Sequence, residues 1–202
     1  MTLLTPHSSL LTGKAAHRAV FLDRDGTVNI EKHYLFRPEE FELFPGVPES
    51  IRRLNQAGFL VIVVTNQSGV ARGYFSLTDV EDLHRHLQAE LALYGAHVDA
   101  FYVCPHHPDH GQGEFRIDCD CRKGAPGMLL QAAKEYAIDM PRSFMVGDKP
   151  ADIEAGLAAG CTPLLVLTGY GQASSPKVAN QVLRFADLPA AVDYIMSPEL
   201  KN

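Results

Sequence analysis

The chain has 202 residues, of which 46% are hydrophobic and 21% are charged, and its formal net charge is -6 at pH 7. This composition is typical of a soluble globular domain that is large enough to bury its own core. The acidic charge argues against a broad nucleic-acid surface, and the longest apolar runs are far too short to cross a bilayer.

Residues 1–18 lack the joined basic and apolar segments of a signal peptide, so we expect a leader there and a cytoplasmic protein. A single domain is expected over 19–196, followed by a tail over 197–202. Three of the four cysteines lie close together among histidines, and only Cys161 stands apart. In a chain without an export signal, this clustering favours a metal site over disulfide bonds.

The first predicted strand covers residues 19–22, an apolar run of the kind that is buried on both faces of a parallel sheet. It is followed at once by Asp23, Asp25 and Gly26. The ligand crevice of open α/β sheets lies outside the carboxyl ends of such strands, so both carboxylates should face it. An Asp-x-Asp-Gly sequence is also common in plain turns, and only the rest of the chain separates the two interpretations.

Residues 29–44 have no sustained period and are predicted to form an irregular loop, either a solvated connection or a segment that covers a substrate. A helix is predicted over 45–58, between a Pro-Gly start and a glycine end. The second buried strand covers 59–64, and hydroxyl and amide groups that can donate to phosphate oxygens follow it. These groups belong to Thr65, Asn66, Gln67 and Ser68.

Residues 70–75 are predicted to continue this loop, and the helix after them is capped by Ser76 or Thr78. The leucines of that helix recur at helical spacing, which gives it one apolar face. His84 and His86 point to different sides of the helix, so we interpret both as ordinary helix residues.

A short third strand, 99–103, runs into a loop over 104–121 that is rich in cysteine and histidine. The loop has little to bury by itself, which favours a metal ion as the means of holding it folded. Three thiols and one imidazole match structural zinc, and such a set leaves no open catalytic position. The predicted ligands are Cys104, His106, Cys119 and Cys121.

Two further histidines, His107 and His110, are alternative zinc ligands. His106 is preferred because alternation along an extended stretch places residues 104 and 106 on the same side. A reduced cysteine cluster without metal is the other interpretation of the same pattern.

Arg122 and Lys123 follow the cluster directly and precede the next predicted helix. They could simply solvate the start of that helix. Cations near a helix N-terminus oppose its dipole, however, so their position indicates another role. The fourth strand, 143–147, ends in a further carboxylate and cation, Asp148 and Lys149.

The rest of the chain is predicted to contain a strand over 163–167, a surface loop over 170–180, an edge strand over 181–185 and a helix over 188–195. Asp152 is expected either to cap the N-terminus of a helix or to contact the residues that bind the ligand without touching the ligand itself. The alternation of strands and helices predicts an α/β fold with a doubly wound, mostly parallel sheet.

Polar strand ends should meet at one place, because right-handed crossovers bring the carboxyl ends of parallel strands to one edge of the sheet. The carboxylates of Asp23, Asp25 and Asp148 gathered there would favour Mg²⁺, which shares its remaining positions with water and phosphate. The predicted chemistry is therefore phosphoryl transfer, with Asp23 or Asp25 as the nucleophile.

Four ordered motifs resemble those of the haloacid-dehalogenase-type (HAD) phosphatases, over nearly the whole chain from residue 19 to about residue 188. They are Asp23 to Thr27, Thr65 with Asn66, Lys123, and Gly147 with Asp148. The Cys/His loop and residues 65–73 further resemble a zinc-containing subfamily without a large cap domain. That subfamily includes heptose-bisphosphate and histidinol-phosphate phosphatases.

The resemblance implies that Asp23 attacks phosphorus and becomes an aspartyl phosphate, while Asp25 protonates the leaving oxygen and later activates water. A carboxyl group with that task must titrate near the working pH, so we expect a raised pKa for Asp25. Thr65 and Lys123 would bind the transferring phosphoryl group. Magnesium would be held by the Asp23 carboxylate, the Asp25 backbone carbonyl and Asp148.

The resemblance also implies that substrate is contacted by the loops after the first two strands and by nearby cations. These residues are Glu31, Lys32, His33, Tyr34, Thr65, Asn66, Gln67, Ser68, Arg122, Lys123 and Lys149.

We expect a monomer that binds a small sugar bisphosphate and has no nucleic-acid or membrane partner. Its reaction would remove the 7-phosphate of a heptose 1,7-bisphosphate, in the synthesis of lipopolysaccharide core precursors. Histidinol phosphate is the alternative substrate, and a catalytically silent zinc-containing binding module is the alternative from another class. Too few residues separate the first two strands for a large cap domain.

Overall fold

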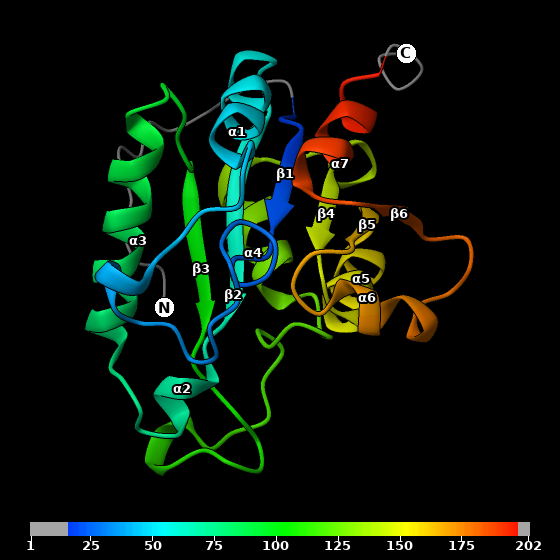
Figure 1. Ribbon diagram of the computed structural model, residues 1–202. Coiled ribbons are helices and arrows are strands. Elements are labelled where there is room, and N and C mark those ends of the chain that lie inside the picture. Colours follow the sequence, from blue (N-terminus) through cyan, green and yellow to red (C-terminus); the bar gives the residue numbers. More distant parts are fainter. Residues whose placement is uncertain (1–15, 198–202) are drawn as a thin grey trace.

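The computed structural model describes residues 16–197. Its six-stranded sheet has the order β3-β2-β1-β4-β5-β6, and each strand pairs with its neighbours in parallel (Figure 1). The strands are β1 (Ala19–Leu22), β2 (Leu60–Asn66), β3 (Ala100–Cys104), β4 (Phe144–Gly147), β5 (Thr162–Val166) and β6 (Leu183–Phe185). The chain winds outward from β1 to β3 and then returns to β4 on the other side of β1, which creates a crevice at the carboxyl ends of these strands.

Helices cover both faces of the sheet (Figure 1). The α-helices of the described residues are α1 (Val47–Gln56), α2 (Ser68–Ala71), α3 (Leu77–Ala92), α4 (Gly127–Tyr136), α5 (Pro150–Ala159), α6 (Gly171–Ser174) and α7 (Leu188–Ile195). Val20 and Leu22 of β1 pack in one core with side chains of α1, α3 and α7. Ala19 and Phe21 pack in a second core with α4 and α5, because successive strand side chains point to opposite faces.

The predicted doubly wound α/β fold is confirmed, and the described residues carry no large cap domain. Two expected loops contain short α-helices: α2 lies in the loop after the second strand, and α6 lies within 170–180. Helices of four residues show no hydrophobic period, so sequence patterns do not reveal them. The second strand also runs further than expected and includes Thr65 and Asn66.

The predicted leader and tail lie almost wholly outside the described residues and stay predictions. At the described end of the leader, His17 already forms a parallel bridge with Ile138. Within 16–197, no helix is both long and apolar enough to cross a membrane.

Candidate active site

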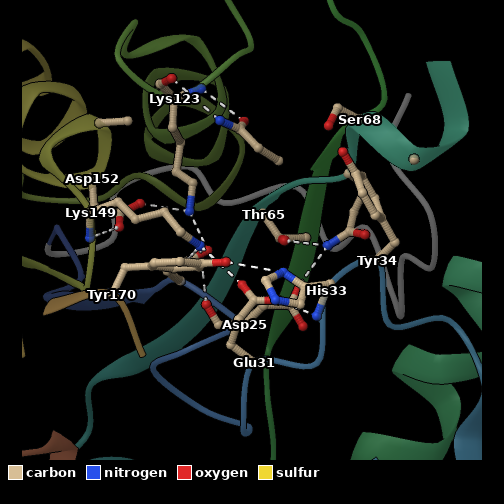
Figure 2. Close-up of a pocket in the computed structure, with 15 residues that line it drawn as sticks. Asp25, Glu31, His33, Tyr34, Thr65, Ser68, Lys123, Lys149, Asp152 and Tyr170 are labelled. Atoms are coloured by element: carbon tan, nitrogen blue, oxygen red, sulfur yellow. Dashed lines mark hydrogen bonds and ion pairs between the residues drawn. The ribbon is translucent and has the colours of Figure 1, made fainter. Parts of the chain in front are cut away.

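A cavity of about 240 Å³ opens at the carboxyl ends of the central strands (Figure 2). Asp23 and Asp25 reach it from the end of β1, Thr65 from β2, Lys123 from the turn before α4, and Lys149 from the end of β4. The parallel sheet therefore brings together side chains that lie far apart in the sequence, as the strand ends predict.

Most of the residues predicted to form the site line this cavity. They are Asp23, Asp25, Glu31, His33, Tyr34, Thr65, Asn66, Gln67, Ser68, Lys123 and Lys149. Lys32, Arg122 and Asp148 are not among the lining residues. The Lys32 ammonium bonds to the Glu40 carbonyl at 2.8 Å, and Arg122 donates to the His106 carbonyl at 3.2 Å.

Three buried carboxylates lie at the base of the site: Asp23, Asp148 and Asp152, each with an oxygen within 4.8 Å of the others. Asp148 Oδ1 has no hydrogen-bond partner among the described residues, and the Lys149 ammonium lies 3.6 Å away. Burial, and then the neighbouring Asp23 carboxylate, raise the pKa of Asp148 to about 8. An unpartnered buried oxygen among carboxylates fits a hard divalent cation such as Mg²⁺.

The third carboxylate of this group is Asp152, and the side chain of Asp25 is not part of it. The resemblance assigns the backbone carbonyl of Asp25, not its side chain, to the magnesium. The Asp25 backbone carbonyl lies 3.4 Å from the Lys149 ammonium, which is itself 4.0 Å from Asp23 Oδ2. That carbonyl therefore faces the same space as the acidic group.

Two glycines, Gly26 and Gly169, pack against Asp148 Oδ2, which also accepts a hydrogen bond of 2.7 Å from the Tyr170 backbone. Both glycines have positive φ, at 95° and 52°, and a Cβ on either would overlap this oxygen. Glycine at these two positions is what allows the chain to close tightly around Asp148.

Lys123 is buried between two of the carboxylates, because its ammonium forms an ion pair with Asp23 and with Asp152, the latter at 2.7 Å. Burial alone would lower the pKa of Lys123, but these two negative charges raise it, so the side chain stays charged. Asp152 also accepts the Lys149 backbone N–H at 3.0 Å, so it both caps α5 and holds Lys123.

Asn66 is predicted to donate to phosphate, yet it holds the backbone of Lys123. Its Oδ1 accepts the Lys123 N–H at 2.9 Å, and its Nδ2 donates to the Lys123 carbonyl at 3.3 Å. This pair of bonds fixes the main chain that presents the lysine to the cavity.

The expectation of a raised pKa for Asp25 is wrong for this structure. Burial would raise the pKa, but the charge of Arg24 and hydrogen bonds from Arg24, Asn29 and Gln67 outweigh burial and hold the pKa below its usual value. The two Arg24 contacts, at 3.1 and 2.8 Å, bind both carboxylate oxygens. The motif pattern does not reveal this cation as a partner, because charged residues at a strand end are normally solvated.

Arg24 has no exposed surface, and it links the site to helix α3. It donates to the Leu35 carbonyl at 3.2 Å and lies 3.3 Å from Nε2 of His84, which stacks on Phe101. Burial, and then the charge of Arg24, lower the pKa of His84 well below its usual value. The interpretation of His84 as an ordinary helix residue is therefore wrong: as a neutral ring it accepts from a buried arginine.

Replacing Arg24 with methionine is expected to lower the free energy of unfolding by about 3–5 kcal/mol, because the variant leaves the Asp25 charge without its buried partner. Urea denaturation of the purified protein measures this loss. The control is Arg85→Met, which removes an exposed ion pair with Asp82 and should change stability by less than about 1 kcal/mol. Equal effects of the two variants would contradict a structural role for Arg24.

The loop after β1 reaches the cavity in a strained conformation. His33 and Tyr34 have positive φ, at 49° and 47°, which is uncommon for residues other than glycine. The Glu31 carboxylate accepts the His33 N–H at 2.8 Å, and it also lies 3.4 Å from the Lys149 ammonium. Strain of this kind persists only where the surroundings hold the backbone in place, which is typical of ligand-binding segments.

The four residues predicted to bind zinc lie together at the end of β3: Cys104, His106, Cys119 and Cys121. Their sulfur–sulfur distances are 3.2, 3.3 and 3.6 Å, and His106 Nδ1 lies 3.3 Å from one sulfur and 3.9 Å from another. Ligands about 2.3 Å from a tetrahedral zinc would be separated by roughly 3.8 Å. The described cysteines are all free thiols, and the donor set fits structural zinc.

His107 is occupied elsewhere, because its Nδ1 accepts the backbone N–H groups of Asp109 and His110, each at 3.2 Å. Of the three histidines in the loop, His106 is therefore the one that faces the thiols.

Comparisons with known proteins agree on one family. The HAD-hydrolase-like family model matches residues 120–190. A D-glycero-beta-D-manno-heptose-1,7-bisphosphate 7-phosphatase of Yersinia pestis is 46% identical over 180 residues, 86% of this chain and 94% of that protein. The protein of the same name from Escherichia coli K12 is 44% identical over 89% of this chain and 96% of its own length.

Solved structures are similar as well. A D,D-heptose 1,7-bisphosphate phosphatase from B. bronchiseptica, complexed with magnesium and phosphate, superposes with a TM-score of 0.80 and 36% identity, covering 88% of this chain and 97% of that one. A phosphatase of the same name from Burkholderia thailandensis has a TM-score of 0.67 and 31% identity, and the match covers 89% of this chain and 99% of that one. With relatives this similar along nearly its full length, the chain belongs to the HAD-like hydrolases, in the family of heptose 1,7-bisphosphate 7-phosphatases.

Proposed function

We propose that this chain is a magnesium-dependent phosphatase that removes the 7-phosphate of D-glycero-D-manno-heptose 1,7-bisphosphate. The observation that carries the proposal is the position of Asp23, which faces the cavity between the Lys123 cation and the buried Asp148 carboxylate. A carboxylate in such surroundings can attack phosphorus while neighbouring charges stabilise the transition state. Similarity to phosphatases of this name over more than four-fifths of the chain supports the choice of substrate.

In the proposed reaction, an Asp23 oxygen attacks the phosphorus and the bond from phosphorus to the sugar oxygen breaks. Asp25 gives its proton to the departing oxygen and then takes a proton from the water that hydrolyses the aspartyl phosphate. The products are the sugar 1-phosphate and inorganic phosphate, with Asp23 restored. A bound phosphate dianion is a like charge beside Asp25, so it would counteract Arg24 and raise the pKa of this carboxyl group.

Other side chains position the phosphate and the loops. Lys123 supplies a fixed positive charge, and the Thr65 hydroxyl, which accepts a hydrogen bond of 2.8 Å from Gln67 Nε2, belongs to a residue that lines the same cavity. Gln67 also donates to Asp25 at 2.9 Å, so one amide aligns both groups. Magnesium would be held by Asp23, Asp148 and the Asp25 carbonyl, and would neutralise phosphate charge.

Zinc would be held by the four-residue cluster and would have a structural role, because all four positions are filled by protein ligands. Cys121 directly precedes Arg122 and Lys123, so an ordered cluster fixes the position of the main chain that carries these two cationic side chains.

A phosphate-release assay tests the proposal. Purified protein with and without Mg²⁺ should be given the heptose 1,7-bisphosphate, other sugar bisphosphates and histidinol phosphate. We expect magnesium-dependent release from the heptose at a kcat/KM at least tenfold above that of any other compound. Faster release from histidinol phosphate would assign the alternative substrate, and no release from any compound would reject the proposed function.

A further inference from the structure

Tyr170 and His33 meet across the mouth of the cavity (Figure 2). Tyr170 lies immediately before α6, and His33 belongs to the strained loop after β1. The Tyr170 hydroxyl lies 3.1 Å from His33 Nδ1, and the two ring centroids are 6.4 Å apart. Two segments that lie far apart in the sequence are therefore joined by a side-chain hydrogen bond at the entrance.

A second cavity, of about 370 Å³, lies against the same pair. Glu31, His33 and Tyr170 line both this cavity and the reaction cavity. The remaining lining of the second cavity includes the apolar side chains of Ile30 and Phe44. The Tyr170–His33 pair thus forms a common wall, with the phosphate chemistry on one side and mostly apolar space on the other.

The position of the Tyr170 ring is well defined although 39% of the residue is exposed. Its backbone N–H donates to Asp148 at 2.7 Å, and the Lys149 ammonium lies 5.0 Å from the ring centroid, within range of a cation–π contact. The bond to Asp148 comes from the main chain, so a shorter side chain at this position leaves it intact. The ring can therefore be removed without removing the support of the cation site.

We propose that Tyr170 is a specificity-determining residue: with His33 it forms a wall that restricts the reaction cavity to slender, primary phosphate esters. This inference rests on the proposed phosphatase function and concerns the shape of the leaving group. A phosphate on a terminal CH₂ group reaches Asp23 past the wall, whereas a phosphate on a secondary carbon carries a branch that the Tyr170 ring opposes. Without the ring, such a branch enters the second cavity.

The test compares two isomers of one compound, glycerol 1-phosphate (primary ester) and glycerol 2-phosphate (secondary ester), using full-length protein with Mg²⁺. The ratio of their kcat/KM values cancels general losses of activity. We expect the wild type to favour the primary ester, and Tyr170→Ala to shift the ratio at least tenfold toward the secondary ester, the size of effect that a small change in pocket shape produces. Tyr170→Phe keeps the ring and should keep the wild-type ratio within about twofold.

His33→Asn shortens the wall from its other side, and asparagine tolerates the positive φ at this position. It should shift the ratio in the same direction and serves as the second test if Tyr170→Ala folds poorly. Tyr94→Ala, an exposed tyrosine in the turn after α3, is the control with an unchanged ratio. Stabilisation by Mg²⁺ in a thermal melt checks that the cation site of each variant is intact.

An unchanged ratio in active Tyr170→Ala and His33→Asn would overturn the inference and leave the proposed function standing. An equal shift in Tyr170→Phe would also overturn it, because the ring would then not be the wall. If the wild type hydrolyses neither these esters nor the heptose bisphosphate, the proposed function itself fails, and this inference fails with it.

Discussion

Replacing Asp23 with asparagine is expected to lower the rate of phosphate release by at least about 10³-fold, because loss of a covalent nucleophile leaves only binding and charge effects. The fold should persist, since the amide is nearly isosteric with the carboxylate and Lys123 keeps its ion pair with Asp152 at 2.7 Å. Steady-state phosphate release, together with a thermal melt, measures both expectations.

Two companion variants separate the roles of this carboxylate. Asp148→Asn removes a carboxylate of the cation site but keeps the nucleophile, so excess Mg²⁺ should restore part of the activity of this variant. Excess Mg²⁺ should restore no activity to Asp23→Asn. Asp193→Asn alters an exposed carboxylate of α7 that is paired with Arg53 of α1 and does not line the reaction cavity, so it should behave as the wild type. Asp23→Asn activity above a hundredth of the wild-type rate would contradict Asp23 as the nucleophile.

Replacing Cys121 with serine is expected to give the second largest effect. The zinc content should fall from one ion per chain to nearly none, because serine is a poor replacement for a thiolate in a tetrahedral site. We expect the free energy of unfolding to fall by about 2–4 kcal/mol and the melting temperature by roughly 5–15 °C. Activity should fall too, since Arg122 and Lys123 follow directly on the chain.

The matched control is Cys161→Ala, which removes a buried cysteine that lies outside the cluster. Its zinc content should stay at one ion per chain, as measured by metal analysis of the dialysed protein. Limited proteolysis should cut the segment between Cys104 and Cys119 in the serine variant only. Full zinc content in Cys121→Ser would show that this thiol is not a ligand.

Apolar runs that stop in polar residues predict the sheet and the place of the candidate site. Asp23, Thr65 and Asp148 each follow or end such a run, and the parallel arrangement brings these ends together. The spacing of Cys104, His106, Cys119 and Cys121 likewise predicts a cluster, because three thiols and one imidazole in two closely spaced pairs match the ligands of structural zinc.

Contacts that form only between distant segments could not be predicted in this way. The bidentate pairing of Arg24 with Asp25 depends on a pocket that His84 and Leu35 complete, and neither lies near Arg24 in sequence. Nothing in the segment around Tyr170 indicates that its hydroxyl meets His33, 137 residues away. A sequence pattern contains only the neighbours of a residue along the chain. The pKa of a group and the walls of a cavity depend instead on the residues that lie nearby in space.

The tight closure of Gly26 and Gly169 around Asp148 sets a limit for anyone who wishes to retarget this enzyme by directed evolution. Libraries that randomise the entrance, where side chains such as Tyr34 and Tyr170 are partly exposed, should yield many folded proteins with altered preferences. Libraries that include the two glycines should yield almost none, since even a methyl group there collides with the carboxylate. Substitutions at the cavity entrance should therefore be widely tolerated, whereas substitutions of the two glycines that pack against Asp148 should not.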